Sequence, residues 1–391
     1  MRSLDHTQFG HVPGLLPDAN QRHLLALLVC QDDLAAVSHF SSPADRDAWL
    51  ATVIESGKTD PRVRDLLPLA YHCLSERGID VKDIAYLRSL RLAFAGRNHQ
   101  QADAWSKVVF QLQLAGIDPV MLKGNSLIVD YYDDPTLRPM TDADILVRIE
   151  DQSRAGDILQ TLGFRKVTLD QDTTNPEFEH ATPYTRAGRE WSDIDLHVHV
   201  LSKCHAAEID QWFFNQLEEY EFYGVKTHRL APTALLTHLL LHGLRHSSTT
   251  PIRWIVDCHQ VLHHRADDIN WREMLSFAKQ HQFTLRLSLA LLYLHDEFGS
   301  MLPTDVEEHL RWHRPRHFER METTFLLKRF PEGASLLSRS LYLMRSMSWR
   351  ACRMRGGWYI PLDFIRVVRH LIAGRSVRTA LVRAWRYGKN N

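Results

Sequence analysis

The 391-residue chain is 44% apolar and 24% charged with a formal net charge of zero, a composition typical of a globular protein and not of a disordered one. No apolar run approaches the roughly 18–20 residues that span a bilayer, and the first residues lack the apolar core of a secretory signal. The five cysteines are scattered without a Cys-x-x-Cys pair, which argues against a disulfide framework or a zinc ribbon. We therefore expect a cytoplasmic protein.

The net charge of zero conceals an opposition between two parts of the chain. The segment from Leu326 onward contains fourteen Lys and Arg residues and only two acidic ones, so its net charge is +12 and that of the remainder is −12. Residues 326–391 are therefore predicted to form a basic helical tail. Its arginines could contact the acidic body of the same chain, an acidic partner, an anionic membrane surface or nucleic acid. A peripheral membrane location through the tail stays open.

Residues 1–115 are predicted to form a helical region. Apolar residues recur at helical spacing in four segments, Asn20–Cys30, Ser42–Ile54, Pro61–Arg77 and about Asp83–Ala115. Pro68 would kink or split the third of these helices, and residues 116–119 end the helical pattern.

The most informative stretch runs from Val120 to Ile149. It begins with a short apolar strand, turns at Lys123-Gly124-Asn125, continues through a helical-looking segment to Tyr132, and ends in the strand Asp142-Ala-Asp144-Ile-Leu-Val. Because alternate residues of a strand share a face, Asp142 and Asp144 are expected to project together while Ala143 points into the core. Two such carboxylates need a compensating cation, and Mg²⁺ suits hard oxygen ligands. A strand cap or a solvated turn is the simpler alternative.

The ordered set Leu122-Lys123-Gly124, Arg138-Pro139 and Asp142-x-Asp144-Ile-Leu-Val resembles an uncharacterised bacterial nucleotidyltransferase-like family of the DNA polymerase β-like superfamily. The resemblance covers roughly residues 120–298. It implies a small mixed sheet, an NTP substrate, expected to be ATP, and Mg²⁺ or Mn²⁺ as cofactor. In such a site two ions stabilise the attacking and leaving oxygens, and Asp144 would bridge them.

The following residues complete an α+β fold. A helix from Asp151 to Leu162, a strand Phe164–Leu169, and a hairpin of Phe178–Thr185 and Glu190–Val200 are expected. The predicted domains are a helical region 1–115, a nucleotidyltransferase core 116–205, a helical domain 206–325 and the tail 326–391.

A third carboxylate is expected on the second hairpin strand. Asp195-Leu196-His197 matches the family's acid-Leu-His pattern, so Asp195 is the leading candidate to activate the acceptor hydroxyl or bind metal, with Asp193 second. His197 and His199 could contact substrate or orient Asp195. An exposed polar strand face is the alternative.

The phosphate-binding side is assigned to Lys123, Gly124, Asn125 and Arg138. Glycine lets backbone N–H groups approach phosphate at the start of a following helix, although Asn125 stands where the superfamily has serine. Arg138 could hold phosphate with its planar fork or form an ion pair with Asp133 or Asp134. Lys123 could neutralise phosphate or only end the strand.

From Gln211 onward the sequence is predicted to be helical. His238, His242 and His246 recur at four-residue spacing, but no HExxH pattern is present and the surroundings are leucine-rich, which favours a core or interface role over a zinc site.

These observations predict a nucleotidyltransferase that moves an NMP from an NTP to an acceptor. A protein, a small molecule, a sugar phosphate and an RNA end all fit as the acceptor. A catalytically inactive scaffold of the same fold and a metal-dependent phosphohydrolase are the alternatives.

Overall fold

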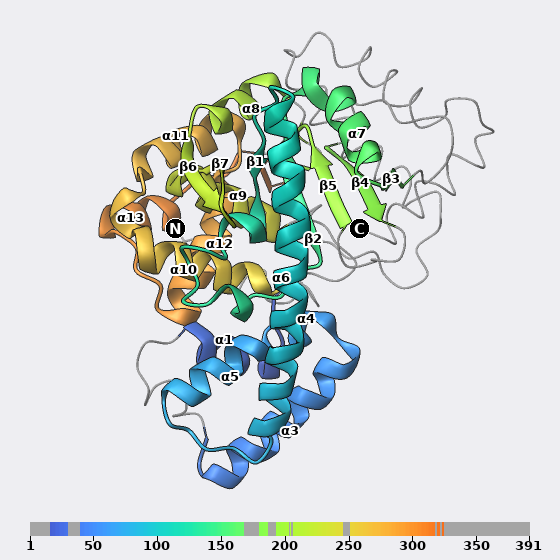
Figure 1. Cartoon of the computed structure of the whole chain (residues 1–391). Helices are drawn as coiled ribbons and strands as arrows, with labels where there is room; N and C mark the ends of the chain where they lie inside the picture. Colours follow the sequence, from blue (N-terminus) through green and yellow to red (C-terminus); the bar gives the residue numbers. More distant parts are fainter. Residues whose placement is uncertain are drawn as a thin grey trace, which may run out of the picture.

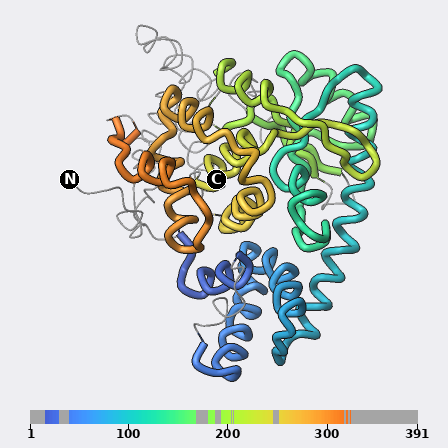
Figure 2. The backbone as a smooth tube through the Cα atoms, turned by 90° about the vertical axis from the view of Figure 1, so that its left-hand side faces the viewer, coloured from blue at the N-terminus to red at the C-terminus, as the bar shows by residue number. Residues whose placement is uncertain are grey.

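The structure is a computed structural model that describes residues 16–29, 40–167, 180–186, 193–202, 204, 206–244, 251–316, 319–320 and 323. A bundle of N-terminal helices lies at one end, and a sheet covered by helices lies at the other (Figure 1). The 31-residue helix α6, Ile84–Leu114, runs from the bundle along the sheet and joins the two parts. Figure 2 shows the same arrangement from the side.

The four predicted N-terminal helices are confirmed, with the third split in two. Ser42 caps its helix by accepting a hydrogen bond from the Asp45 backbone N–H, and Asp60 does the same for Arg62. Pro68 lies in the first turn of the second half, where its missing N–H costs no helical bond. Among the described residues, the helices before α6 are α1 (Ala19–Val29), α3 (Pro43–Thr59), α4 (Pro61–Arg64) and α5 (Leu67–Glu76).

A seven-stranded mixed sheet forms the centre of the second part, in the order β3-β4-β5-β2-β1-β7-β6. The neighbours β2 and β5 are parallel, as are β1 and β7, and the other pairs are antiparallel. The predicted α+β fold and the hairpin of β4 and β5 are therefore confirmed. The strands are β1 (Val120–Met121), β2 (Asp142–Leu146), β3 (Phe164–Lys166), β4 (Ala181–Arg186), β5 (Asp193–His197), β6 (Leu217–Phe222) and β7 (Val225–Leu230).

Two apolar cores lie on the two faces of this sheet. Along β2, Ala143 and Ile145 belong to the core that includes α6 and α7 (Gln152–Thr161), whereas Leu146 belongs to the core formed with the C-terminal helices. The expected inward placement of Ala143 and Ile145 is thus confirmed, since both are fully buried.

The helical prediction from Gln211 onward is wrong for β6 and β7. Tyr220 and Phe222 are buried while Glu219 and Glu221 are exposed, which is the period of a strand. The hairpin turns at Tyr223 and Gly224, both with positive φ (47° and 81°), as a tight two-residue turn requires. Glutamate-rich composition concealed this pattern, because glutamate is uncommon in strands.

One local prediction is also wrong. The segment after Lys123 forms a short 3₁₀ turn, Lys123–Ser126, and not a helix reaching Tyr132. The predicted helix from Asp151 to Leu162 is confirmed as α7, with Asp151 at its N-cap position, although the Asp151 side chain accepts a hydrogen bond from the Arg154 side chain and not from the backbone of the first turn.

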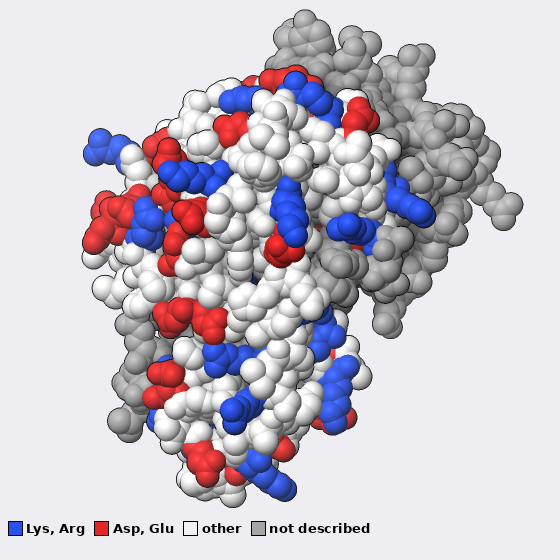
Figure 3. Space-filling view, in the orientation of Figure 1, with Lys and Arg blue, Asp and Glu red and all other residues white. Residues whose placement is uncertain are grey.

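The other predicted C-terminal helices are confirmed. Among the residues described, no helix is both long and apolar enough to cross a bilayer. On the face drawn in Figure 3, acidic and basic side chains are interspersed. The basic tail, including residues 326–391, and His246 lie outside the described residues. The helices are α8 (Ala207–Phe214), α9 (Pro232–Gly243), α10 (Arg253–Arg265), α11 (Trp271–His281), α12 (Thr284–Phe298) and α13 (Thr304–Arg311).

Candidate active site

The carboxylates singled out in the sequence meet where β2 and β5 run side by side. The parallel register pairs Asp142 with Asp193 and Asp144 with Asp195. Because residues paired in this way point to the same face, the two strands present four carboxylates together. Asp144 is 5% exposed, and the other three are half-buried.

Asp144 is the centre of the carboxylate group. Its Oδ1 accepts a hydrogen bond from Lys123 Nζ at 2.5 Å and lies 2.8 Å from His197 Nε2. Burial alone would raise the pKa of Asp144, but the Lys123 ammonium and His197 outweigh it and hold this pKa below its ordinary value. Asp144 is therefore charged at neutral pH.

The neighbouring carboxyls have the opposite shift. Burial and the charge of Asp144 raise the pKa of Asp142 to about 6, and the same two causes raise the pKa of Asp195. Thr141 Oγ1 donates to Asp142 at 3.1 Å and offsets part of this effect. A cation placed between these groups would remove the repulsion.

The donor set fits a divalent metal ion. Asp144, Asp195 and His197 each offer a ligand atom, and these atoms all lie within 4.8 Å of one another. Asp142, predicted as a ligand, adjoins this group without belonging to it, whereas His197 belongs to it. His199 points elsewhere, because its Nδ1 lies 2.6 Å from Asp210 Oδ2 on α8.

The turn Lys123–Ser126, which follows β1, supplies a cationic and an amide side chain near the carboxylates. Lys123 has a left-handed backbone (φ 48°), a conformation that costs a residue with a Cβ about 1 kcal/mol. Asn125 is 1% exposed, and its side-chain Nδ2 has no hydrogen-bond partner among the described residues. No α-helix follows this turn in the described residues, so the helix N-terminus expected beside Gly124 is not formed.

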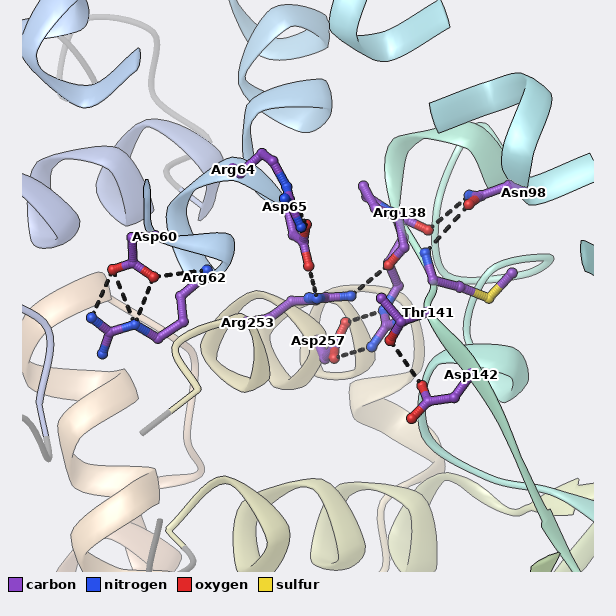
Figure 4. Close-up of polar contacts among 12 residues, drawn as sticks. Asp60, Arg62, Arg64, Asp65, Asn98, Arg138, Thr141, Asp142, Arg253 and Asp257 are labelled. Carbon is purple, nitrogen blue, oxygen red and sulfur yellow. Dashed lines mark hydrogen bonds and ion pairs between the residues drawn. The ribbon is translucent and has the colours of Figure 1, made fainter. Parts of the chain in front are cut away.

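Arg138 is buried beside the same turn. Its Nε and Nη2 donate to the two carboxylate oxygens of Asp257 at 2.7 and 2.8 Å (Figure 4). Its Nη1 lies 2.0 Å from the position that a Cβ on Gly124 would occupy, so Gly124 leaves room for the guanidinium. The expected alternative partners are otherwise engaged, Asp134 with Arg91 and Asp133 with His72.

These groups line one cavity of about 270 Å³. Its lining contains the carboxylates of Asp142, Asp144 and Asp195 together with the side chains of Lys123, Asn125 and Arg138. Side chains of α9 and α10 complete the lining, namely Leu239, His242, Arg253, Trp254 and Asp257. All seven site residues predicted from the sequence therefore lie around one space.

Sequence reasoning did not assign Arg253 and Asp257 to the site. Asp257 follows Arg253 by one helical turn and lies among the buried residues Ile255, Val256 and Cys258. The sequence signal that could have identified Asp257 is its position as a charged residue on the apolar face of a helix, because such a group is buried only with a partner.

Residues 62–299 match the family described as uncharacterised nucleotidyltransferase. The chain belongs to this nucleotidyltransferase family. The match begins well before Val120, where the sequence resemblance was expected to begin, and ends before the basic tail.

Comparisons with other proteins add one structure. A crystal structure of an antigenic nucleotidyltransferase-like protein from Paracoccidioides brasiliensis is similar at 16% identity and a TM-score of 0.35, over 55% of this chain and 94% of that one. A search of curated proteins gives no significant match.

Proposed function

We propose that the protein transfers an NMP from an NTP, with ATP as the expected donor, to a hydroxyl or phosphate acceptor. The observation that carries this proposal is that one cavity is lined both by the carboxylates Asp142, Asp144 and Asp195 and by the donor side chains of Lys123, Asn125 and Arg138. Triphosphate transfer needs positioning and charge neutralisation more than covalent chemistry. Family membership supports the reaction class.

Asp144, Asp195 and His197 would hold the first Mg²⁺ or Mn²⁺, with Asp142 beside them. When bound, the metal would neutralise charge that develops on the attacking and leaving oxygens.

The chain's own residues would bind and orient the nucleotide. Asn125 Nδ2, buried without a partner among the described residues, is a donor available to a phosphate oxygen. Lys123 Nζ would neutralise phosphate charge once it leaves Asp144. Asp195, paired with Asp144 across the two parallel strands, would take the proton of the acceptor hydroxyl.

One observation favours the alternative of an inactive scaffold with the same fold. The ammonium of Lys123 already neutralises Asp144, so a cation of the chain itself occupies one carboxylate oxygen. A phosphohydrolase, by contrast, would use the same carboxylates and release free phosphate.

Calorimetric titration with non-hydrolysable ATP and GTP analogues and Mg²⁺ tests the proposal. Asp195→Asn is expected to lose metal-dependent binding, and Asp193→Asn, two residues away on the same strand, serves as its matched control. With hydrolysable nucleotide and candidate acceptors, release of pyrophosphate would support transfer, whereas free phosphate would indicate the hydrolase. If the folded wild type binds neither analogue, the inactive scaffold becomes the favoured interpretation.

A further inference from the structure

Helix α6 holds the loop that leads into β2. Asn98, fully buried in the middle of α6, donates to the backbone carbonyls of Pro135 (3.1 Å) and Arg138 (2.9 Å) and accepts from the Met140 N–H at 3.3 Å. One side chain thus satisfies three backbone groups of the loop, and Figure 4 shows two of these bonds, including the one to Arg138. Buried backbone groups need such partners, so the path of the loop depends on Asn98.

Two further α6 side chains hold the same loop. Arg91 Nη2 contacts Asp134 Oδ2 at 2.6 Å, and Arg97 Nη2 donates to the Met140 carbonyl at 3.1 Å. Arg91 and Asn98 are seven residues apart and share one face of α6, and Arg97 adds a contact beside them, so the helix holds the loop from Asp134 to Met140. Asp142 follows Met140 by two residues, so the loop sets where β2 begins.

Arg253 ties this loop to a second N-terminal element. Its Nη1 donates to the Pro139 carbonyl at 2.5 Å, and its Nη2 pairs with Asp65 Oδ2 at 2.6 Å (Figure 4). Asp65, which is 5% exposed, lies between α4 and α5. Arg253 also lines the cavity and opens α10, the helix that carries Asp257. One guanidinium therefore joins the N-terminal helices, the loop and the cavity wall.

We propose that the N-terminal helices are part of the nucleotide site, with Asp65, Asn98 and Arg253 as positioning residues. They hold the loop 134–141 and through it the Arg138 fork and the first carboxylate of β2. That the ligand is a nucleotide rests on the proposed function, but the coupling between the N-terminal helices and the loop 134–141 does not. The family match supports it independently, because it starts at residue 62 and so contains all three residues.

Asp65→Asn tests this coupling, and Asp60→Asn is its matched control. Both aspartates flank α4 and pair with an arginine, but Asp60 pairs with Arg62 and does not contact the loop (Figure 4). Hydrogen exchange of the segment 135–146 and calorimetry with a non-hydrolysable ATP analogue and Mg²⁺ are the two measurements. We expect Asp65→Asn to speed exchange in this segment and weaken analogue binding, each at least threefold, and Asp60→Asn to change neither.

A second variant keeps the test decisive if Asp65→Asn does not fold. Arg253→Gln removes the same contact from a side chain that is 23% exposed, and it should give effects of at least the same size. Because Arg253→Gln already removes the contact with Asp65, as well as the bond to Pro139, the double variant should show the effect of Arg253→Gln alone.

Unchanged exchange of segment 135–146 in folded Asp65→Asn and Arg253→Gln would overturn the inference. If the wild type binds no nucleotide while exchange responds as expected, the proposed function fails and the positioning role stands.

Discussion

Replacing Gly124 by alanine should disrupt the site through Arg138 alone. The backbone of Gly124 does not have a positive φ, so alanine itself can adopt it. The added Cβ would lie 2.0 Å from Arg138 Nη1 and 2.8 Å from its Cζ. Ordinary contact requires about 3.5 Å, so the guanidinium must move by about 1.5 Å.

The cost follows from what holds that guanidinium. Arg138 and Asp257 are both buried and joined by two hydrogen bonds, and Tyr132 Oη donates to the same carboxylate at 2.7 Å. Overpacking costs about 1–3 kcal/mol and breaking a buried ion pair about 3–5 kcal/mol. Since Arg138 is displaced but its partner remains, we expect a loss of about 3 kcal/mol in the free energy of unfolding.

Urea unfolding measures this loss, and Gly96→Ala provides the control. Gly96 lies in α6, and a Cβ there would meet nothing within 4 Å. Alanine at this position should therefore raise stability by about 0.5–1 kcal/mol. A Gly124→Ala protein as stable as the wild type would refute the assignment of Gly124 as the space for Arg138.

Three further predictions concern single features. Lys123→Met should weaken binding of the ATP analogue at least tenfold in calorimetry, because it removes the ammonium beside Asp144, whereas Lys107→Met on exposed α6 should not. Burial would raise the pKa of Asp257, but Arg138 outweighs it and lowers this pKa. The pair therefore stabilises the fold above about pH 4, and urea midpoints should fall as the pH drops below that value, more steeply than in Asp257→Asn. Gly224→Ala should cost about 1 kcal/mol in unfolding, because φ is 81° in the β6–β7 turn.

The sequence predicted the elements whose patterns are local. Helical periodicity located the N-terminal helices, and period-two alternation placed Asp142 and Asp144 on one strand face. The pairing of Asp144 with Asp195 could also be expected, because a family pattern marked the second strand. The first two inferences need only neighbouring residues, and the third also needs the family pattern.

The partner of Arg138 could not be predicted in this way. Asp133 and Asp134 are near in sequence, yet Asp257, 119 residues away, holds the guanidinium. An ion pair between distant segments depends on how helices pack, and no local spacing reports it. The same holds for Lys123 and Asp144, which meet only because the turn after β1 lies beside β2.

The charges around the cavity lead to a last prediction, that nucleotide binding requires the divalent ion. Among the described lining residues, Lys123, Arg138 and Arg253 face four aspartates, Asp142, Asp144, Asp195 and Asp257. With all of these groups charged, the lining carries no positive excess for a triphosphate.

The existing pairs reduce the attraction further. Arg138 is neutralised by Asp257, Arg253 by Asp65, and Lys123 by Asp144. A free triphosphate would meet the remaining carboxylates at short range, and like charges repel strongly where water is scarce. An added divalent cation would reverse this balance, because it would compensate the carboxylates and leave Lys123 able to contact the phosphates. Calorimetry should therefore detect binding of the ATP analogue with Mg²⁺ or Mn²⁺ and at least a hundredfold weaker binding in EDTA. Equal affinity in EDTA would mean that the cationic side chains suffice for nucleotide binding, and it would contradict a metal-binding role of the cavity carboxylates.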